Sequence, residues 1–191
     1  MNLKQIKGEI INDKENKPFH KKGWEPIYTA HKSAKILIIG QAPGRLAQES
    51  NVPWNDLSGD NLRAWLGMIK EIFYDEKKVA LVPMDFYFPG SKERGDVPPR
   101  KGFAEKWHPL ILENMPNIEL TILIGQYSQE LYLGTKRKKS LTETVKSFEE
   151  YLPNYLPLVH PSPRNNIWLK KNPWFKEEII PKLQKIVRRI V

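Results

Sequence analysis

Short apolar runs that end in glycine constrain the fold of this chain more than any other feature. Residues 35–40 read Lys-Ile-Leu-Ile-Ile-Gly, and residues 120–125 read Leu-Thr-Ile-Leu-Ile-Gly. A continuous β-branched run of this length is typical of a parallel strand that is buried on both faces. Two further short apolar runs, 79–82 and 155–159, are strand candidates, and segments with helical spacing lie between the runs. This alternation predicts an α/β fold, a three-layer α/β/α sandwich with a central four-stranded parallel sheet.

The length of 191 residues fits one domain, and a hydrophobic content of 40% is sufficient to fill its core. We expect residues 35–191 to form this domain and the polar, basic residues 1–34 to form an N-terminal extension. Apolar spacing predicts a helix over residues 60–73, capped by Asp60, and a helix over residues 103–115 that is interrupted near Pro109.

Composition narrows the class of protein. The chain has no cysteine, which excludes disulfides, thiolate nucleophiles and cysteine-ligated metal clusters. No run approaches the roughly 20 apolar residues that span a bilayer, and residues 1–22 are charged throughout, so we expect a cytoplasmic protein without membrane contact. The 31 basic residues exceed the 22 acidic ones, and the net charge of +9 favours a polyanionic partner. No heptad pattern is visible, so a monomer is expected.

A proline-fixed loop follows the last apolar run. Residues 158–166 read Leu-Val-His-Pro-Ser-Pro-Arg-Asn-Asn. Each proline fixes its own φ and pushes the preceding residue into an extended conformation, so His160 and Ser162 are held in stiff backbone. Ligand sites of open α/β sheets lie at the carboxyl ends of the strands, where His160 is expected. A structural histidine is the alternative, and the polar neighbours Arg164 and Asn165 count against it.

A second loop, Gly-Gln-Ala-Pro-Gly at residues 40–44, follows the first predicted strand. Its glycines allow close backbone approach, and its proline stiffens the turn. The sequence contains neither the GxxxxGK[S/T] nor the GxGxxG pattern, so it gives no support for binding of a nucleoside triphosphate or a dinucleotide. Farther on, Trp54 stands in a polar loop, where its ring is either a core side chain or a platform on which a base stacks.

Together the two loops resemble the two signature motifs of the uracil-DNA glycosylase superfamily. Residues 160–165 are similar to the second motif of its single-strand-selective monofunctional branch, and residues 40–44 are similar to the Gly-Glu-Ala-Pro-Gly first motif of its iron–sulfur branch. Pro53 and Trp54 resemble the Pro-Phe pair that supplies the base-stacking ring there, and the similarity extends from about residue 35 to the C-terminus. It implies a uracil-DNA glycosylase-like fold and a DNA glycosylase that works without metal or cofactor.

The resemblance also implies roles for individual residues. His160 would donate to the negative charge that develops on the departing base, and Gln41 would orient the attacking water with help from a backbone amide near Ala42. Trp54 would stack on the flipped base, and Ala42 belongs to the same base-binding set. The implied DNA contacts are Pro43, Gly44, Ser162, Arg164, Asn165 and Asn166.

Three positions depart from the superfamily pattern. Gln41 and Ala42 stand where relatives carry carboxylate or amide side chains, so the first motif offers no carboxylate to activate water. The sequence Val-Pro-Met at residues 82–84 stands where a uracil-reading asparagine is usual. Asp85 lies nearby and would accept a hydrogen bond from a base N–H, which suggests a deaminated purine or another modified base as readily as uracil. Other loop carboxylates are candidate substitutes, although solvated side chains are the simpler interpretation: Glu49, Asp56 and Asp60.

Three functions remain open at this point. The first is a monofunctional DNA glycosylase that removes uracil or another deaminated base in base excision repair, from single-stranded DNA or a damaged duplex. The second is a catalytically weak or inactive DNA-binding module on the same fold, which the residues Gln41 and Ala42 favour. The third is a hydrolase or binder of free nucleosides or nucleotides, whose binding would depend little on salt.

Overall fold

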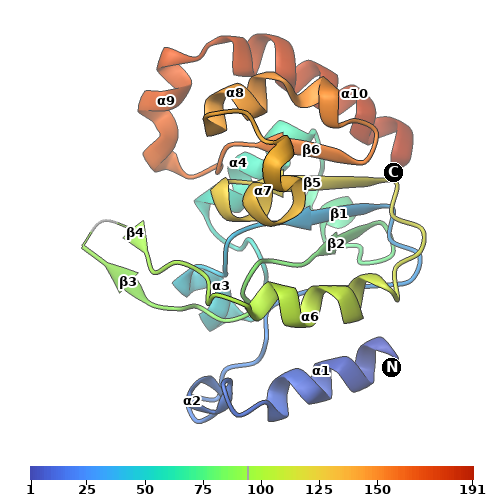
Figure 1. Cartoon of the computed structure of the whole chain (residues 1–191), viewed down its shortest axis with the longest axis vertical. Helices are drawn as coiled ribbons and strands as arrows, with labels where there is room; N and C mark the ends of the chain where they lie inside the picture. Colours follow the sequence, from blue (N-terminus) through green and yellow to red (C-terminus); the bar gives the residue numbers. More distant parts are fainter. Residues whose placement is uncertain (94) are drawn as a thin grey trace.

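The computed structural model describes residues 1–93 and 95–191, and it confirms the predicted sandwich (Figure 1). The central sheet is parallel, with strand order β2-β1-β5-β6. All carboxyl ends of these strands therefore lie along one edge of the sheet. The strands are β1 (Ile36–Ile39), β2 (Val79–Leu81), β5 (Leu120–Ile124) and β6 (Tyr155–Leu158), and a separate antiparallel hairpin consists of β3 (Ser91–Lys92) and β4 (Gly95–Asp96).

Helices cover both faces of the sheet (Figure 1). The N-terminal half contains α1 (Leu3–Asn12), α2 (Lys17–His20), α3 (Arg45–Ser50), α4 (Leu57–Leu66) and α5 (Lys70–Phe73). The C-terminal half contains α6 (Phe103–Leu112), α7 (Gln126–Leu133), α8 (Leu141–Lys146), α9 (Asn166–Lys171) and α10 (Ile180–Ile190). A π-helical turn, Phe175–Ile179, leads directly into α10, and 3-10 turns lie at Gly134–Lys136, Phe148–Tyr151 and Pro163–Asn165.

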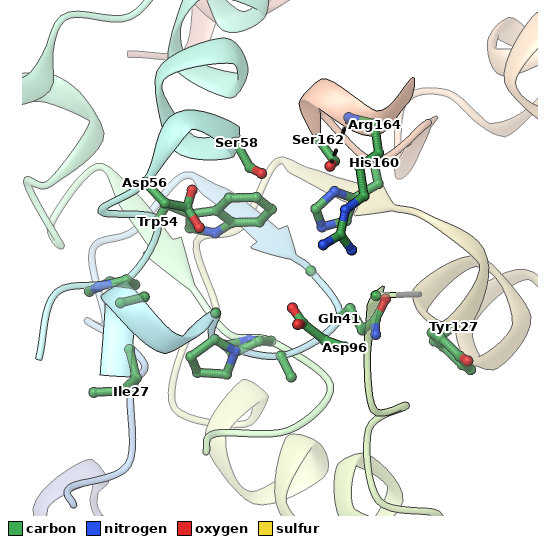
Figure 2. A pocket seen from close by; sticks show the side chains of 18 of the residues that line it. Ile27, Gln41, Trp54, Asp56, Ser58, Asp96, Tyr127, His160, Ser162 and Arg164 are labelled. Carbon is green, nitrogen blue, oxygen red and sulfur yellow. Dashed lines mark hydrogen bonds between the residues drawn. The ribbon is translucent and has the colours of Figure 1, made fainter. Parts of the chain in front are cut away.

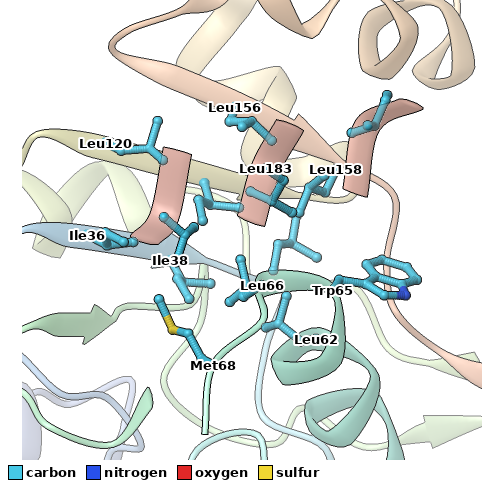
Figure 3. Close-up of a cluster of buried hydrophobic side chains, with 14 of the residues drawn as sticks. Ile36, Ile38, Leu62, Trp65, Leu66, Met68, Leu120, Leu156, Leu158 and Leu183 are labelled. Carbon is cyan, nitrogen blue, oxygen red and sulfur yellow. The ribbon is translucent and has the colours of Figure 1, made fainter. Parts of the chain in front are cut away.

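Successive side chains of β1 point to opposite faces of the sheet, and the core consists of one cluster on each face. Ile36 and Ile38 face a cluster that includes side chains of α4 and α10 (Figure 3). Leu37 and Ile39 face the opposite cluster, with side chains of α1 and α6. Because every residue of β1 is buried, the strand is apolar throughout rather than alternating, as the sequence pattern indicates.

Residues 1–34 pack against the domain and contribute to its core. Ile6 and Ile10 of α1 are fully buried, and α1 contacts α6. Thr29 forms an antiparallel bridge with Leu81 at the end of β2. The boundary at residue 34 stays a prediction, but the segment that precedes it supplies core side chains.

Two helices differ from the sequence-based expectation. The first begins at Leu57, and Asp56 rather than Asp60 is its N-cap, with the Asp56 carboxylate accepting from the Gly59 amide at 2.9 Å. Gly67, with φ of 65°, ends α4 and separates it from α5. Helix α6 continues through Pro109, which removes one backbone donor without ending the helix. Within the described part of the chain, no helix has the length and apolar character needed to cross a membrane.

Candidate functional site

A cavity of about 580 Å³ opens at the carboxyl edge of the sheet, between the loops that follow β1 and β6 (Figure 2). Parallel α/β sheets place their ligands at this edge, because the connecting loops diverge there. Of the predicted site residues that the structure describes, all but Asp85 and Asn166 line the cavity. The lining includes Gln41, Ala42, Pro43, Gly44, Trp54, His160, Ser162, Arg164 and Asn165.

His160 lies two residues after the end of β6, and its ring faces that of Trp54 across the cavity (Figure 2). The two ring centroids are 5.8 Å apart, with an angle of 33° between the ring planes. Burial lowers the pKa of His160, and the carboxylates of Asp56 and Asp96 act in the opposite direction. The neutral ring therefore predominates near pH 7, where it offers one N–H donor.

The loop that carries His160 is fixed by side-chain amides. Asn165 donates to the His160 carbonyl at 2.7 Å, and Asn61 of α4 donates to the Pro161 carbonyl at 2.8 Å. The Ser162 hydroxyl accepts from the Arg164 amide at 3.2 Å and begins the 3-10 turn that follows. Asn165 thus holds the loop that aims His160, in addition to lining the cavity.

Trp54 has a strained backbone, with φ of 58°. A bulky side chain in the left-handed region is an outlier, which persists only when the surroundings hold it. The Trp54 carbonyl accepts long hydrogen bonds from Arg63 Nη1 at 3.4 Å and from the Tyr74 hydroxyl at 3.3 Å. Glycines make room for the residue, since a Cβ on Gly59 would lie 1.8 Å from the Trp54 carbonyl oxygen and one on Gly40 2.6 Å from its ring.

The loop after β1 is fixed to the segment after β2. Backbone amides of Met84 and Asp85 donate to the carbonyls of Gly40 and Gln41, at 2.9 and 3.1 Å. These bonds hold the backbone of the first motif, so that the Gln41 side chain is presented at the cavity. In Figure 2 it lies at the opposite side from Trp54.

The structure corrects the prediction that Asp85 reads a base. The Asp85 side chain is 1% exposed and forms a two-point ion pair with Arg100, with Nε–Oδ2 at 2.7 Å and Nη2–Oδ1 at 2.8 Å. Amides of Tyr87 and Arg100 also donate to it, each at 3.1 Å. Because these partners occupy the carboxylate and it lies outside the cavity lining, Asp85 holds the loop after β2. Asn166 is exposed at the start of α9, and its contact with DNA stays a prediction.

Other lining residues were not predicted from the sequence. Asp96 reaches the cavity from β4, Tyr127 from α7 and Ser58 from α4, and Pro83 forms part of the wall. These four residues lie outside both motif loops, so no local sequence pattern indicates that they line the cavity. The Pro83 carbonyl accepts a hydrogen bond from His108 Nε2 at 2.9 Å, which fixes this part of the wall.

The family model of the uracil DNA glycosylase superfamily matches residues 26–184 of the chain. The match includes both motif loops, the whole parallel sheet and most of the covering helices. It begins before β1, so it also includes the segment around Thr29 that bridges to β2. The extent of the match and the arrangement of the sheet agree with the similarity of the two loops, and the chain belongs to the uracil DNA glycosylase superfamily.

Proposed function

We propose that this protein is a monofunctional DNA glycosylase that hydrolyses the N-glycosidic bond of a flipped-out uracil or another deaminated base in DNA. Membership of the superfamily supports a uracil-DNA glycosylase-like function in general. The observation that carries the specific proposal is the placement of the Trp54 and His160 rings at one cavity. An aromatic platform beside an N–H donor suits a nucleobase removed from its stack.

The chemistry follows from the charge that develops when the bond breaks. The base departs with the bonding electron pair, and the sugar gains positive, oxocarbenium-like character. A neutral His160 donates a hydrogen bond to the base oxygen that becomes negative, and the partial burial of the ring strengthens this interaction. Gln41 orients a water molecule beside the sugar, since an amide donates and accepts hydrogen bonds but does not take a proton at neutral pH.

The DNA partner is supported by charge and by the position of one arginine. The chain carries a net charge of +9, and Arg164 is exposed at the cavity, where its guanidinium suits a phosphate next to the flipped nucleotide. Ser162 and the loop at residues 40–44 border the same opening. The predicted monomeric state and cytoplasmic location remain predictions.

A panel of labelled oligonucleotides tests this function. Each single-stranded or duplex oligonucleotide carries one uracil, hypoxanthine, xanthine or undamaged base, and is incubated with excess protein before alkali treatment. We expect strand breakage at one lesion, with a rate constant about 100-fold lower in His160→Ala, as for removal of one donor to a developing anion. His20→Ala, which changes an exposed histidine on α2, is the matched control and should keep the full rate.

Two results would contradict the proposal. Tight, salt-sensitive binding without breakage at any lesion would identify a DNA-binding module on the same fold, which the absence of a carboxylate at Gln41 and Ala42 favours. Binding of free nucleosides or nucleotides that is insensitive to salt, with no DNA binding, would identify a protein that acts on small molecules.

A further inference from the structure

The β3–β4 hairpin brings a carboxylate to the cavity from outside both motifs. The hairpin follows the segment after β2 in the chain and protrudes at the carboxyl edge of the sheet (Figure 1). Ser91 pairs with Asp96 and Lys92 with Gly95 in antiparallel register, and the Val97 amide donates to the Gly90 carbonyl at 2.9 Å to close the base of the hairpin. Gly95 and Asp96 of β4 contribute to the cavity lining.

The hairpin passes close to the second motif at Gly95. Gly95 has φ of 98°, and a Cβ built on it would lie 3.3 Å from Arg164 Nη1. The glycine therefore allows both the backbone turn and the close approach to the Arg164 guanidinium. The Gly90–Val97 hydrogen bond closes the base of the hairpin, and Asp96 follows Gly95, the residue that lies near Arg164.

The Asp96 carboxylate points into the cavity, beside Gln41 (Figure 2). It faces the space bordered by Trp54 and His160, and its charge is one of those that act on His160. The Ser91 hydroxyl donates to Asp96 Oδ1 at the long distance of 3.4 Å. Gln41 and Asp96 line the same cavity, so a water molecule bound there lies within reach of both side chains.

The other carboxylate at the cavity, Asp56, has a structural role. Its Oδ1 accepts from the Gly59 amide at 2.9 Å and caps α4. Its Oδ2 packs close to Gly44, where an added Cβ would lie 3.2 Å away. These contacts hold Asp56 between the first motif and α4, whereas Asp96 stands on the hairpin and beside the water-orienting amide of Gln41.

We propose that Asp96 is the catalytic residue that accepts the proton of the attacking water, an assignment that rests on the glycosylase function proposed above. The water oxygen bonds to C1′ of the sugar as the N-glycosidic bond breaks, and the bonding pair leaves with the base. The proton of the water passes to the Asp96 carboxylate and then to solvent, and the base anion, hydrogen-bonded by His160, takes a proton from solvent. Gln41 orients the water, and the negative charge of Asp96 also stabilises the positive sugar.

Single-turnover cleavage by Asp96→Asn is the first test, using oligonucleotides that carry one uracil or one hypoxanthine. Loss of a general base typically lowers the rate constant by a factor on the order of 100 or more, and we expect this loss in Asp96→Asn. Glu93→Gln makes the same change of charge at an exposed position on the same hairpin and should stay within about threefold of the wild type. A rate constant for Asp96→Asn within threefold of the wild type would overturn the assignment.

Binding to abasic-site analogues gives a readout that does not need turnover. One oligonucleotide carries a cationic pyrrolidine in place of the sugar, and the other carries a neutral tetrahydrofuran. A carboxylate beside the sugar should favour the cation by about 10-fold in Kd, and Asp96→Asn should lose this preference while Glu93→Gln keeps it. A preference that persists in Asp96→Asn, or that is lost in Asp56→Asn instead, would overturn the assignment.

The two tests separate failure of this inference from failure of the proposed function. If the wild type cleaves a lesion and prefers the cationic analogue, and Asp96→Asn keeps both properties, the proposed glycosylase function stands. The role proposed for Asp96 is then wrong. A wild-type protein that neither cleaves nor binds either analogue would contradict the proposed function, and the assignment of Asp96 with it.

Discussion

Removal of the Arg100 guanidinium tests whether Asp85 holds the fold. In Arg100→Met the side chain keeps its apolar stem, but the buried Asp85 carboxylate loses the partners at 2.7 and 2.8 Å. The guanidinium also donates to Asn16 Oδ1 at 2.8 Å, and it lies over the rings of Phe19 and Phe103, at 4.9 and 4.2 Å from their centroids. The substitution therefore loosens the link between the N-terminal segment and the loop after β2.

The expected loss of stability follows from burial. Asp85 is 1% exposed and Arg100 is 25% exposed, so the variant leaves a carboxylate in the interior with two backbone donors. Removing one partner of a buried ion pair costs about 3 to 5 kcal/mol, and the partial exposure of Arg100 places this case near the lower figure. In a chain of this size, a loss of about 3 kcal/mol lowers Tm by roughly 6 to 12 °C.

Urea unfolding at pH 7, followed by circular dichroism, measures this loss. The double variant Asp85→Asn/Arg100→Met should regain about 1 to 2 kcal/mol relative to Arg100→Met, because a neutral amide costs less to leave without its partner. A loss below about 1 kcal/mol in Arg100→Met would refute the reasoning, as would a double variant that is no more stable than the single one.

Asp85→Asn alone should lower stability without changing which lesion is cleaved, and a changed lesion preference would restore Asp85 as a base-reading residue.

Three further predictions concern pH, packing and salt. Burial lowers the pKa of His108 to about 4, so its contribution to stability is complete above the unfolded pKa of about 6.5 and is lost as the pH falls toward 4. At pH 4.5 this loss amounts to about 2 to 3 kcal/mol, and urea unfolding should show it in the wild type but not in His108→Gln. Gly59→Ala would place a Cβ 1.8 Å from the Trp54 carbonyl oxygen and should lower the free energy of unfolding by about 3 kcal/mol or more. By contrast, Gly8→Ala in α1, where no described heavy atom lies within 4 Å of the new Cβ, should raise it by about 0.5 to 1 kcal/mol. Arg164→Ala should reduce the slope of log Kobs for DNA against log salt by about 1, and an unchanged slope would show that Arg164 does not contact a phosphate.

The parallel sheet could be predicted from the sequence because its signal is local. The strands at residues 36–39 and 120–124 are buried on both faces, so their apolar character identifies them. The loops after β1 and β6 were also predictable, since proline and glycine constrain the backbone without help from distant residues. His160 and Gln41 lie at one cavity, as their positions after the strands predict, and Trp54, whose place was left open between core and site, lines the same cavity.

The direction of a side chain in an irregular segment could not be predicted in the same way. Asp85 follows β2 and was expected to face the site, but Arg100, 15 residues later, pairs with it on the other side of the loop. No periodicity links these two residues, because the described residues between them form no helix and no strand longer than the short β3 and β4. The helix cap was missed for a related reason, since Asp56 and Asp60 both precede apolar residues with suitable spacing and only the backbone at Asp56 is extended.

The candidate site combines parts that are fixed by different kinds of interaction. Gln41 and His160 stand at the ends of β1 and β6, and the hydrogen bonds of the sheet determine their separation. Asp96 stands on a hairpin that passes close to Arg164, a residue of the second motif that is far from it in the sequence. A carboxylate that comes from a separate hairpin cannot be predicted from either motif, because each motif contains only the residues that directly follow a strand. The first motif lacks a carboxylate, but the cavity that it borders does not, because the hairpin supplies Asp96 from outside the motif.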